Sequence, residues 1–226
     1  IIQSFGPNEV VVRVGEVERA GGELSQKIKE SLAQALGEGA FEVRRVEVVG
    51  PKVGRDLTRK AILAIVFSWI GMLVYIAWRF EFRYAVGGIL ALVHDTIITI
   101  GAMSLLNKEF DLTIVAALLT IIGYSINDTI VVFDRIRENV RKNIKQPLAE
   151  VINSSINQTL SRTILTSLTV FLVLLALFFL GGPVIHDFSF ALLVGVVVGT
   201  YSSIFIASAI VLAWERVKPS KPKRKK

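Results

Sequence analysis

Residues 61–78 read AILAIVFSWIGMLVYIAW and carry no charged side chain. An α-helix rises 1.5 Å per residue, so about 18–20 apolar residues cross the roughly 30 Å hydrocarbon core of a bilayer. Four more segments have this character: Tyr84–Leu106, Leu112–Phe133, Thr163–Ile185 and Phe188–Trp214. A soluble protein could bury one such helix. Five in succession predict a mainly α membrane protein built on a bundle of five transmembrane helices.

Composition excludes several classes of protein. The 226 residues are 52% hydrophobic, with a mean hydropathy of +0.57, which is too apolar for an ordinary soluble domain. Cysteine is absent, and the two histidines, His94 and His186, lie far apart in the sequence. We therefore expect no metal site. The chain has no Gly-rich phosphate loop with a lysine and no nucleophile–base–acid set, so we expect no cofactor and no enzymatic activity.

The distribution of charge predicts the orientation in the membrane. One side of the predicted bundle holds 14 Lys and Arg side chains against 5 Asp and Glu, and the other side holds 11 against 12. Cytoplasmic loops are the ones enriched in Lys and Arg. The C-terminal tail is thus expected in the cytoplasm and the N-terminal segment outside. The tail, residues 216–226, is interpreted as an anchor beside anionic lipid rather than as a nucleic-acid site.

Three regions follow from these patterns. Residues 1–56 are predicted to form a small, partial α/β extracytoplasmic domain, with strands at Glu9–Val14 and Phe41–Val49 and an amphipathic helix at Glu23–Leu36. So short a segment cannot build a full core, so we expect it to pack against a partner or further chain. Residues 57–215 form the transmembrane domain, and the basic tail follows.

Asp128 is the first candidate for chemistry within the membrane. Ionisable residues in hydrocarbon are costly and usually face a bundle interior or a water-filled path. Thr120, Tyr124 and Asp128 follow at four-residue spacing, with Gly123 and Asn127 beside them, so one stripe of this helix is polar. The alternative is a structural aspartate that holds helices together by hydrogen bonds.

Two further ionisable residues lie in the predicted spans. Arg162 precedes the segment Thr163–Ile185, with Thr166 following on the same helix, and its depth is similar to that of Asp128. An ion pair between the two is therefore expected; the alternative is that Arg162 extends to the interface as one more positive anchor. Asp95, after His94, lies midway along its segment and is either functional or a satisfied structural carboxylate.

The sequence also predicts a close contact between helices. Gly195, Gly199, Ser203 and Ala207 recur every four residues, and small residues on one helix face allow another helix to approach closely.

Five motifs carry a family resemblance: VGPKVGRDL (Val49–Leu57), ALVHDTIITIG (Ala91–Gly101), DLTIVAALLTIIGYSINDTIVVFDRIREN (Asp111–Asn139), QTLSRTILTS (Gln158–Ser167) and LGGP (Leu180–Pro183). Together they resemble the SecF family of bacterial protein-export subunits, part of the proton-driven resistance–nodulation–division superfamily. A complete SecF begins with another spanning helix and an FTGG-type motif. Neither is present, so the chain is expected to be the C-terminal part of a SecF or of a fused SecDF.

The resemblance implies a function and its participants. Asp128 and Arg162 match the family's proton-conduction residues, with Asp95 a third candidate and Tyr124, Asn127 and Thr166 a supporting polar face. The implied partners are SecD or a SecD-like half, the SecYEG channel, the exported unfolded polypeptide, protons and membrane lipids, without nucleic acid. The implied location is the bacterial inner membrane, and the implied role is assistance to secretion driven by the proton-motive force.

Two other functions stay open. The chain could be half of a proton-driven small-molecule efflux pump, although the SecF-like motifs and the small outer segment disfavour this. It could also be a non-conducting scaffold that stabilises its partners. An Asp128→Asn substitution separates the classes, because a scaffold tolerates it.

Overall fold

The computed structural model describes residues 2–4, 10–12, 21–37, 39–44, 46, 51–108 and 110–217. Its contacts divide the chain into two compact units, Ile1–Lys60 and Ala61–Lys226. The division falls within α2, a continuous helix from Pro51 to Arg79.

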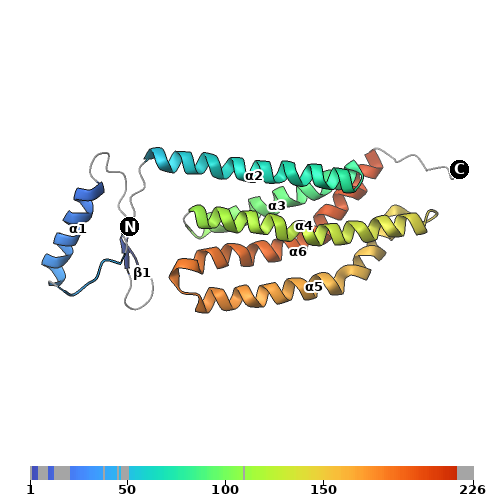
Figure 1. Ribbon diagram of the computed structural model, residues 1–226. Helices are drawn as coiled ribbons and strands as arrows, with labels where there is room; N and C mark the ends of the chain where they lie inside the picture. Colours follow the sequence, from blue (N-terminus) through green and yellow to red (C-terminus); the bar gives the residue numbers. More distant parts are fainter. Residues whose placement is uncertain are drawn as a thin grey trace. The chain divides into compact units, whose positions relative to one another are not determined.

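The described part of the N-terminal unit contains two short strands and a helix (Figure 1). Strands β1, Ile2–Ser4, and β2, Val10–Val12, pair in antiparallel register with Ile2 opposite Val12. Helix α1 runs from Gly21 to Leu36. It ends at Gly37, whose φ of 96° is left-handed and whose N–H donates to the Ala33 carbonyl at 3.0 Å. A glycine adopts this helix-ending conformation without the strain a side chain would add.

The predictions for this segment are confirmed only in part. The helix over Glu23–Leu36 is confirmed, and residues 10–12 of the strand predicted at Glu9–Val14 form β2. The strand predicted at Phe41–Val49 is wrong where the structure describes it, because residues 41–44 and 46 belong to no strand; its other residues lie outside the described ones. Val43 and Val46 are 40% and 49% exposed, so neither has a packing surface that would stabilise a strand.

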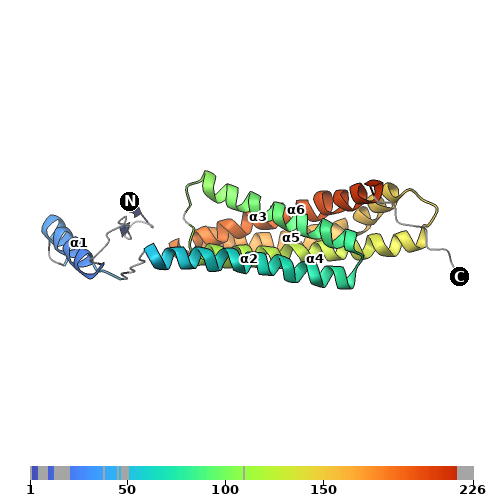
Figure 2. The same ribbon diagram turned by 90° about the horizontal axis from the view of Figure 1, so that it is seen from above.

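Five long helices follow, as the sequence predicted: α2, then α3 (Phe82–Leu105), α4 (Leu112–Lys142), α5 (Leu148–Leu180) and α6 (Pro183–Val217). In the described part of the chain, these five are long and apolar enough to span a membrane. Figure 2 shows α3 to α6 running lengthwise beside one another. The fold class of the membrane domain, a mainly α bundle, is thereby confirmed.

Helix α5 differs from its predicted segment, Thr163–Ile185, at both ends. It begins 15 residues earlier, at Leu148, because its polar first half still has a buried face (Val151, Ile152, Ser155 and Thr159) that stabilises a helix. It ends at Leu180 because Gly181 and Gly182 follow, Gly182 having φ 75°. Pro183 then opens α6, where a missing N–H costs nothing.

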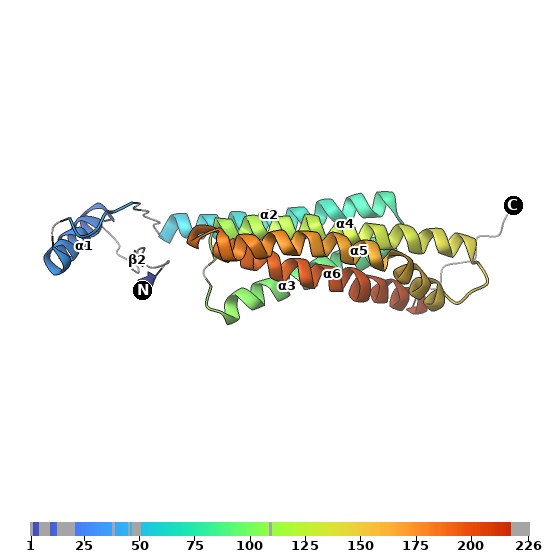
Figure 3. The ribbon, with the colours of Figure 1, turned by 90° about the horizontal axis from the view of Figure 1, so that it is seen from below.

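Helix α6 is the centre of the bundle, since it contacts α3, α4 and α5 (Figure 3). Its small-residue stripe allows other helices to approach closely, as predicted: Gly195, Gly199 and Ser203 face α4, and Ala207 lies beside Gly87 of α3. A Cβ at Gly195 would overlap the side chain of Ile121, and a Cβ at Gly199 would lie 3.0 Å from that of Ser125. One turn further, the hydroxyls of Ser203 and Thr129 are 2.9 Å apart. Successive turns of the two helices therefore meet side by side.

Two apolar clusters fill the bundle. The first contains buried residues Ile76, Phe80, Tyr84, Phe133 and Ile136, and the second contains Met103, Ile114, Leu118, Leu174 and Val196. Buried polar side chains gather where the clusters meet along α4, between Ile121 and Val132; they include Asp95, Ser125, Asp128, Ser167 and Ser202. The fold thus surrounds a polar layer with apolar packing.

Ion pairs join the helix ends. At one end Arg83 bonds Glu215 at 2.5 Å and Glu81 at 2.9 Å, joining the start of α3 to the end of α6. At the other end Lys108 pairs with Asp187 at 2.7 Å, joining the segment after α3 to the start of α6. These contacts fix α6 at both ends.

Candidate functional site

Asp128 lies within the bundle on α4. Its residue is 5% exposed, and Oδ2 accepts a hydrogen bond from the Ser167 hydroxyl of α5 at 3.3 Å. This is its single side-chain hydrogen bond among the described residues. Asp128 thus points inward as predicted, whereas Thr120, Gly123 and Asn127 of the predicted polar stripe are exposed.

Ser167 connects three helices. Its Oγ accepts from the Tyr124 hydroxyl of α4 at 3.2 Å and from Thr200 Oγ1 of α6 at 2.7 Å, and it donates to Asp128. A hydroxyl has one donor and two acceptor positions, so these three bonds satisfy Ser167 completely. We call Tyr124, Asp128, Ser167 and Thr200 the hydroxyl cluster. A proton gained or lost by Asp128 therefore alters hydrogen bonds that join α4, α5 and α6.

Arg162 is not part of this cluster. In the described part of the chain no ion pair joins it to Asp128, and its residue is exposed. The two residues thus make no direct ion pair among the described residues, although the charge of Arg162 acts on Asp128 at longer range. The reason is helical geometry: Arg162 precedes Ser167 by five residues, which is about 140° around an α-helix. With Ser167 facing α4, Arg162 points to the surface of the bundle.

The other predicted polar residues divide between the interior and the surface. Tyr124 is half-buried and bonds Ser167, whereas Asn127 and Thr166 are exposed. The Thr166 hydroxyl donates to the backbone carbonyls of Arg162 and Thr163, each at 3.0 Å. Asn127, Arg162 and Thr166 thus give α4 and α5 polar groups on the outside of the unit.

Asp95 has a different and more complete environment. Its residue is 1% exposed, and Oδ2 accepts from Ser125 Oγ of α4 at 2.6 Å and from Ser202 Oγ of α6 at 2.8 Å. Oδ1 lies 3.1 Å from His94 Nδ1. Three neighbours on three helices thus hold this carboxylate. Because Ser125 precedes Asp128 by three residues, the Asp95 contacts also fix the turn of α4 that bears Asp128.

Four residues of these arrangements were missed by sequence reasoning: Ser125, Ser167, Thr200 and Ser202. A signal existed for Ser167, since Ser155, Thr159, Thr163 and Ser167 repeat every four residues. That stripe identifies the buried face of α5, one position away from the predicted Thr166. For Ser125, the signal was Thr129 four residues later. Thr200 and Ser202 stand in the run TYSS (residues 200–203), in which the sequence does not show which hydroxyls face inward.

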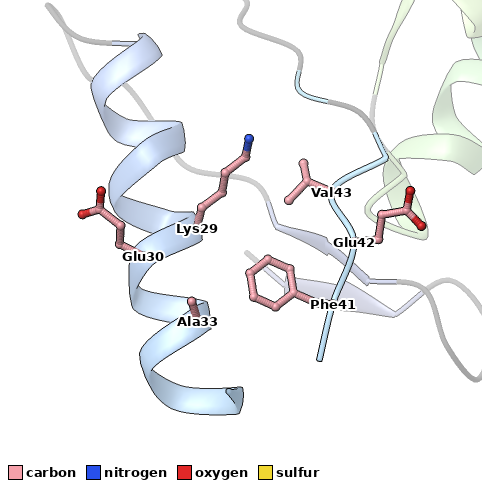
Figure 4. Close-up of a pocket in the computed structure, with 6 residues that line it drawn as sticks. All are labelled: Lys29, Glu30, Ala33, Phe41, Glu42 and Val43. Carbon is pink, nitrogen blue, oxygen red and sulfur yellow. The ribbon is translucent and has the colours of Figure 1, made fainter. Parts of the chain in front are cut away.

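Other possible sites are weaker. Among the described residues, no three His, Asp or Glu side chains gather in a way that could hold a metal ion. In the N-terminal unit a shallow depression lies between α1 and residues 41–43, lined by Lys29, Glu30, Ala33, Phe41, Glu42 and Val43 (Figure 4). The lining charges are exposed, so they converge on no enclosed space. The polar layer of the bundle is the candidate site.

Comparison with known proteins agrees with this architecture. Residues 27–217 match the family model described as protein export membrane protein SecD/SecF, C-terminal. The chain is 55% identical over 217 residues to the protein translocase subunit SecF of Magnetococcus marinus, covering 94% of this chain and 70% of that one. Identity to the SecF of Calditerrivibrio nitroreducens is 54%, with coverages of 93% and 70%.

A solved structure is similar as well. The crystal structure of SecDF, a translocon-associated membrane protein from Thermus, aligns with a TM-score of 0.77 and 46% identity. The alignment covers 92% of this chain and 28% of the SecDF chain. The present chain therefore spans about a quarter of that longer polypeptide.

Proposed function

The chain belongs to the SecD/SecF family of protein-export membrane proteins, and on this premise we propose that it couples the proton gradient to the translocation of secreted proteins. Its homologues named as SecF translocase subunits support the accessory role in export. The proton coupling rests on the polar layer of the bundle. Like its family, the chain is a multi-pass protein of the bacterial inner membrane.

The observation that carries the proposal is the contrast between two buried carboxylates. Asp95 is held by two serine hydroxyls and His94, whereas Asp128 accepts one long bond of 3.3 Å from Ser167. A buried carboxylate with few donors is costly when charged. Taking up a proton removes that cost, so Asp128 is the group whose protonation is most sensitive to its surroundings.

The energies are of comparable size. Moving one elementary charge through 100 mV releases about 2.3 kcal/mol. A tenfold change in the proton affinity of a carboxylate corresponds to about 1.4 kcal/mol. A modest rearrangement around Asp128 is therefore enough to bind a proton from one side and release it to the other.

Arg162 supports a partner at this level of the bundle. An exposed guanidinium on a membrane helix requires a counter-charge or water, and among the described residues Arg162 makes no direct ion pair, the charge of Asp128 acting on it only at longer range. We assign that counter-charge to a SecD-like half packed on α4 and α5, with Asn127 and Thr166 as polar neighbours. Movement of that half would change the electric field at Asp128. Protonation of Asp128 would thereby be linked to conformational change, which takes place beside a SecYEG channel engaged with the exported polypeptide.

Asp95 has a supporting role in this account. The carboxylate oxygens of Asp95 hold α3, α4 and α6 together around the turn of α4 that carries Asp128. The small N-terminal unit is assigned to the outer side of the membrane, where its strands and helix act as part of a larger export domain.

The proposed orientation has a direct test. The chain lacks cysteine, so Lys223→Cys introduces a single reactive thiol. We expect a membrane-impermeant maleimide to label this position only from the cytoplasmic side, because that side holds the excess of Lys and Arg. Glu30→Cys, in α1, is the matched variant and should be labelled only from outside. Labelling of residue 223 from outside would overturn the topology.

Export in vesicles tests the function itself. Inverted membrane vesicles containing the channel, the complete complex and an unfolded secretory polypeptide are given an acidic interior. We expect faster translocation with the gradient than after an uncoupler collapses it, and this difference should require the complex. If the gradient stimulates translocation equally without the complex, the coupling belongs to another component. The same result is expected if this chain is a non-conducting scaffold.

A further inference from the structure

Helix α2 is the least enclosed of the five long helices. Of its most apolar 18 residues 6% are buried, against 17% for α5 and 44%, 50% and 56% for α3, α4 and α6. Ile76, in the last turn, is the one buried residue among the described side chains of α2, and Phe80, which follows the helix, is buried as well. The groups around this end of α2 therefore decide how firmly the helix is held.

Two guanidinium groups meet at this end of α2. The Cζ atom of Arg79 lies 5.0 Å from the centroid of the Phe80 ring, and the Cζ atom of Arg137 on α4 lies 5.8 Å from the same centroid. Arg137 Nη1 also donates to the backbone carbonyl of Arg79 at 3.3 Å. The ring attracts both cations, so the two arginines are held near each other although their charges repel.

The charge of these arginines is only partly balanced. Arg79 Nη2 faces both oxygens of the exposed Asp134 at 3.4 Å. Neither Arg137 nor the exposed Arg141, one turn further along α4, makes an ion pair within the described part of the chain. Like charges at four-residue spacing on a helix repel each other. Arg79, Arg137 and Arg141, called here the arginine surface, are thus three cations beside one carboxylate.

Nearby parts of the chain do not supply the missing negative charge. Glu81 and Glu215 both bind Arg83, at 2.9 and 2.5 Å, so each of these carboxylates already has a cation. The tail after Val217 contains no Asp or Glu. An anion that completes the arginine surface therefore comes from outside this chain.

Apolar and aromatic side chains of α2 lie next to the arginine surface. Trp78 is 85% exposed, and Val74 and Tyr75, about one turn earlier, are also exposed. Tyr75 precedes Arg79 by four residues and so shares its face of the helix. Exposed Trp and Tyr rings are typical of the level at which lipid headgroups meet acyl chains. This end of the bundle is also the one that the excess of Lys and Arg predicts to be cytoplasmic.

We propose that the arginine surface binds the phosphate of an anionic phospholipid of the inner leaflet, with an acyl chain along Val74 and Trp78. Guanidinium groups bind phosphate oxygens through paired N–H donors, and basic surfaces between transmembrane helices suit acidic headgroups. A soluble phosphate would gain the arginine contacts alone, whereas a lipid also covers the exposed apolar residues of α2.

The bound lipid acts as a clamp between two helices. Its phosphate joins Arg79 of α2 to Arg137 of α4, and its acyl chain covers a helix that the rest of the bundle leaves open. The lipid thereby fastens the least enclosed helix of the bundle. This role goes beyond the proposed function and does not depend on proton coupling.

Native mass spectrometry of the complete complex, titrated with phosphatidylglycerol, measures this binding. We expect Arg137→Gln to bind one phosphatidylglycerol fewer per copy of the chain, because the affinity at the arginine surface falls about tenfold. Binding of zwitterionic phosphatidylcholine should be unchanged. Lys145→Gln is the matched control: it removes an exposed cation from the connection between α4 and α5 and should bind as the parent does.

Asp134→Asn should act in the opposite direction. It removes the carboxylate that faces Arg79, so the same occupancy should be reached at about one third of the lipid concentration. Weaker binding in this variant would contradict a site that recognises negative charge.

A further variant and a competitor separate the remaining outcomes. Arg137→Gln also loses a bond to the end of α2, so if it fails to assemble, Arg141→Gln replaces it and should need about threefold more phosphatidylglycerol for the same occupancy. Glycerol 3-phosphate at the same concentration should displace no lipid; displacement would assign the arginine surface to a soluble phosphate and overturn the proposal. Equal phosphatidylglycerol binding by the parent and the arginine variants would overturn it as well.

Discussion

Replacing Asp128 by Asn is expected to abolish the gradient-dependent part of export while leaving the protein folded. Asparagine has the same shape and still accepts a hydrogen bond from Ser167, but it cannot bind or release a proton at physiological pH. The stimulation by the gradient should therefore fall at least about tenfold, which corresponds to about 1.4 kcal/mol or more. Assembly with the partner half should continue.

The measurement is translocation of an unfolded secretory polypeptide into inverted vesicles, with and without an imposed gradient. Asp134→Asn is the matched control, since this carboxylate lies on the same helix but is exposed and faces Arg79 at 3.4 Å. It should respond to the gradient as the parent does, because an exposed ion pair contributes little. An Asp128→Asn complex that still responds fully would move the coupling site elsewhere.

Replacing Asp95 by Ala is expected to destabilise the bundle strongly. The substitution removes the acceptor for Ser125 and Ser202 and the neighbour of His94, all at a residue that is 1% exposed. Ser202 keeps the Gly199 carbonyl as an acceptor at 3.1 Å, whereas Ser125 loses its acceptor. A buried donor left without a partner costs about 1–3 kcal/mol, so we expect a loss of at least this size. The reason is structural: α3, α4 and α6 all bond through this side chain.

Unfolding of the purified protein in detergent or bicelles measures this effect. Asp95→Asn keeps an acceptor oxygen and should lose less stability than the alanine variant, and it should also retain a response to the proton gradient. Asp134→Ala provides an exposed comparison and should unfold close to the parent. If Asp95→Ala unfolds with the parent, the hydrogen bonds at Asp95 do not hold the helices. Loss of gradient response in Asp95→Asn would instead place this residue on the proton route.

The membrane fold was predictable because its signals are local. A run of 18 uncharged residues has few outcomes other than a spanning helix, and the five helices are those that hydropathy predicts. The small stripe Gly195–Gly199–Ser203–Ala207 likewise predicted a close helix contact. The end of α5 was predicted too late in the sequence. The apolar segment continues through Gly181 and Gly182, but the helical backbone ends at Leu180.

The site was predictable only to the level of one helix. The cost of a charge in hydrocarbon was enough to predict that Asp128 points inward, but the four-residue repeat does not mark the buried face, because Thr120 is exposed. Arg162 was expected to pair with Asp128 because the two residues lie at a similar depth. The 140° between Arg162 and Ser167 around α5 prevents a direct contact, and the charge of Arg162 acts on Asp128 only at longer range. The Asp95 contacts were not predictable, since Ser125 and Ser202 reach it only after α4 and α6 have packed on α3.

The strand predicted at Phe41–Val49 fails for a related reason. Its valines favour an extended backbone, but a strand also needs a neighbour for its backbone groups, and β2 pairs with β1 instead. Whether such a segment forms a strand depends on a second strand, which its own sequence pattern does not describe.

The central claim is that protons pass through Asp128 while a polypeptide is being exported. Inverted vesicles with an acidic interior, an external pH-sensitive dye and a translocating polypeptide measure this directly as proton efflux per complex. The account predicts faster efflux from parent vesicles during translocation than at rest, with Asp128→Asn at the resting rate under both conditions. Equal translocation-dependent efflux from parent and Asp128→Asn vesicles would contradict it.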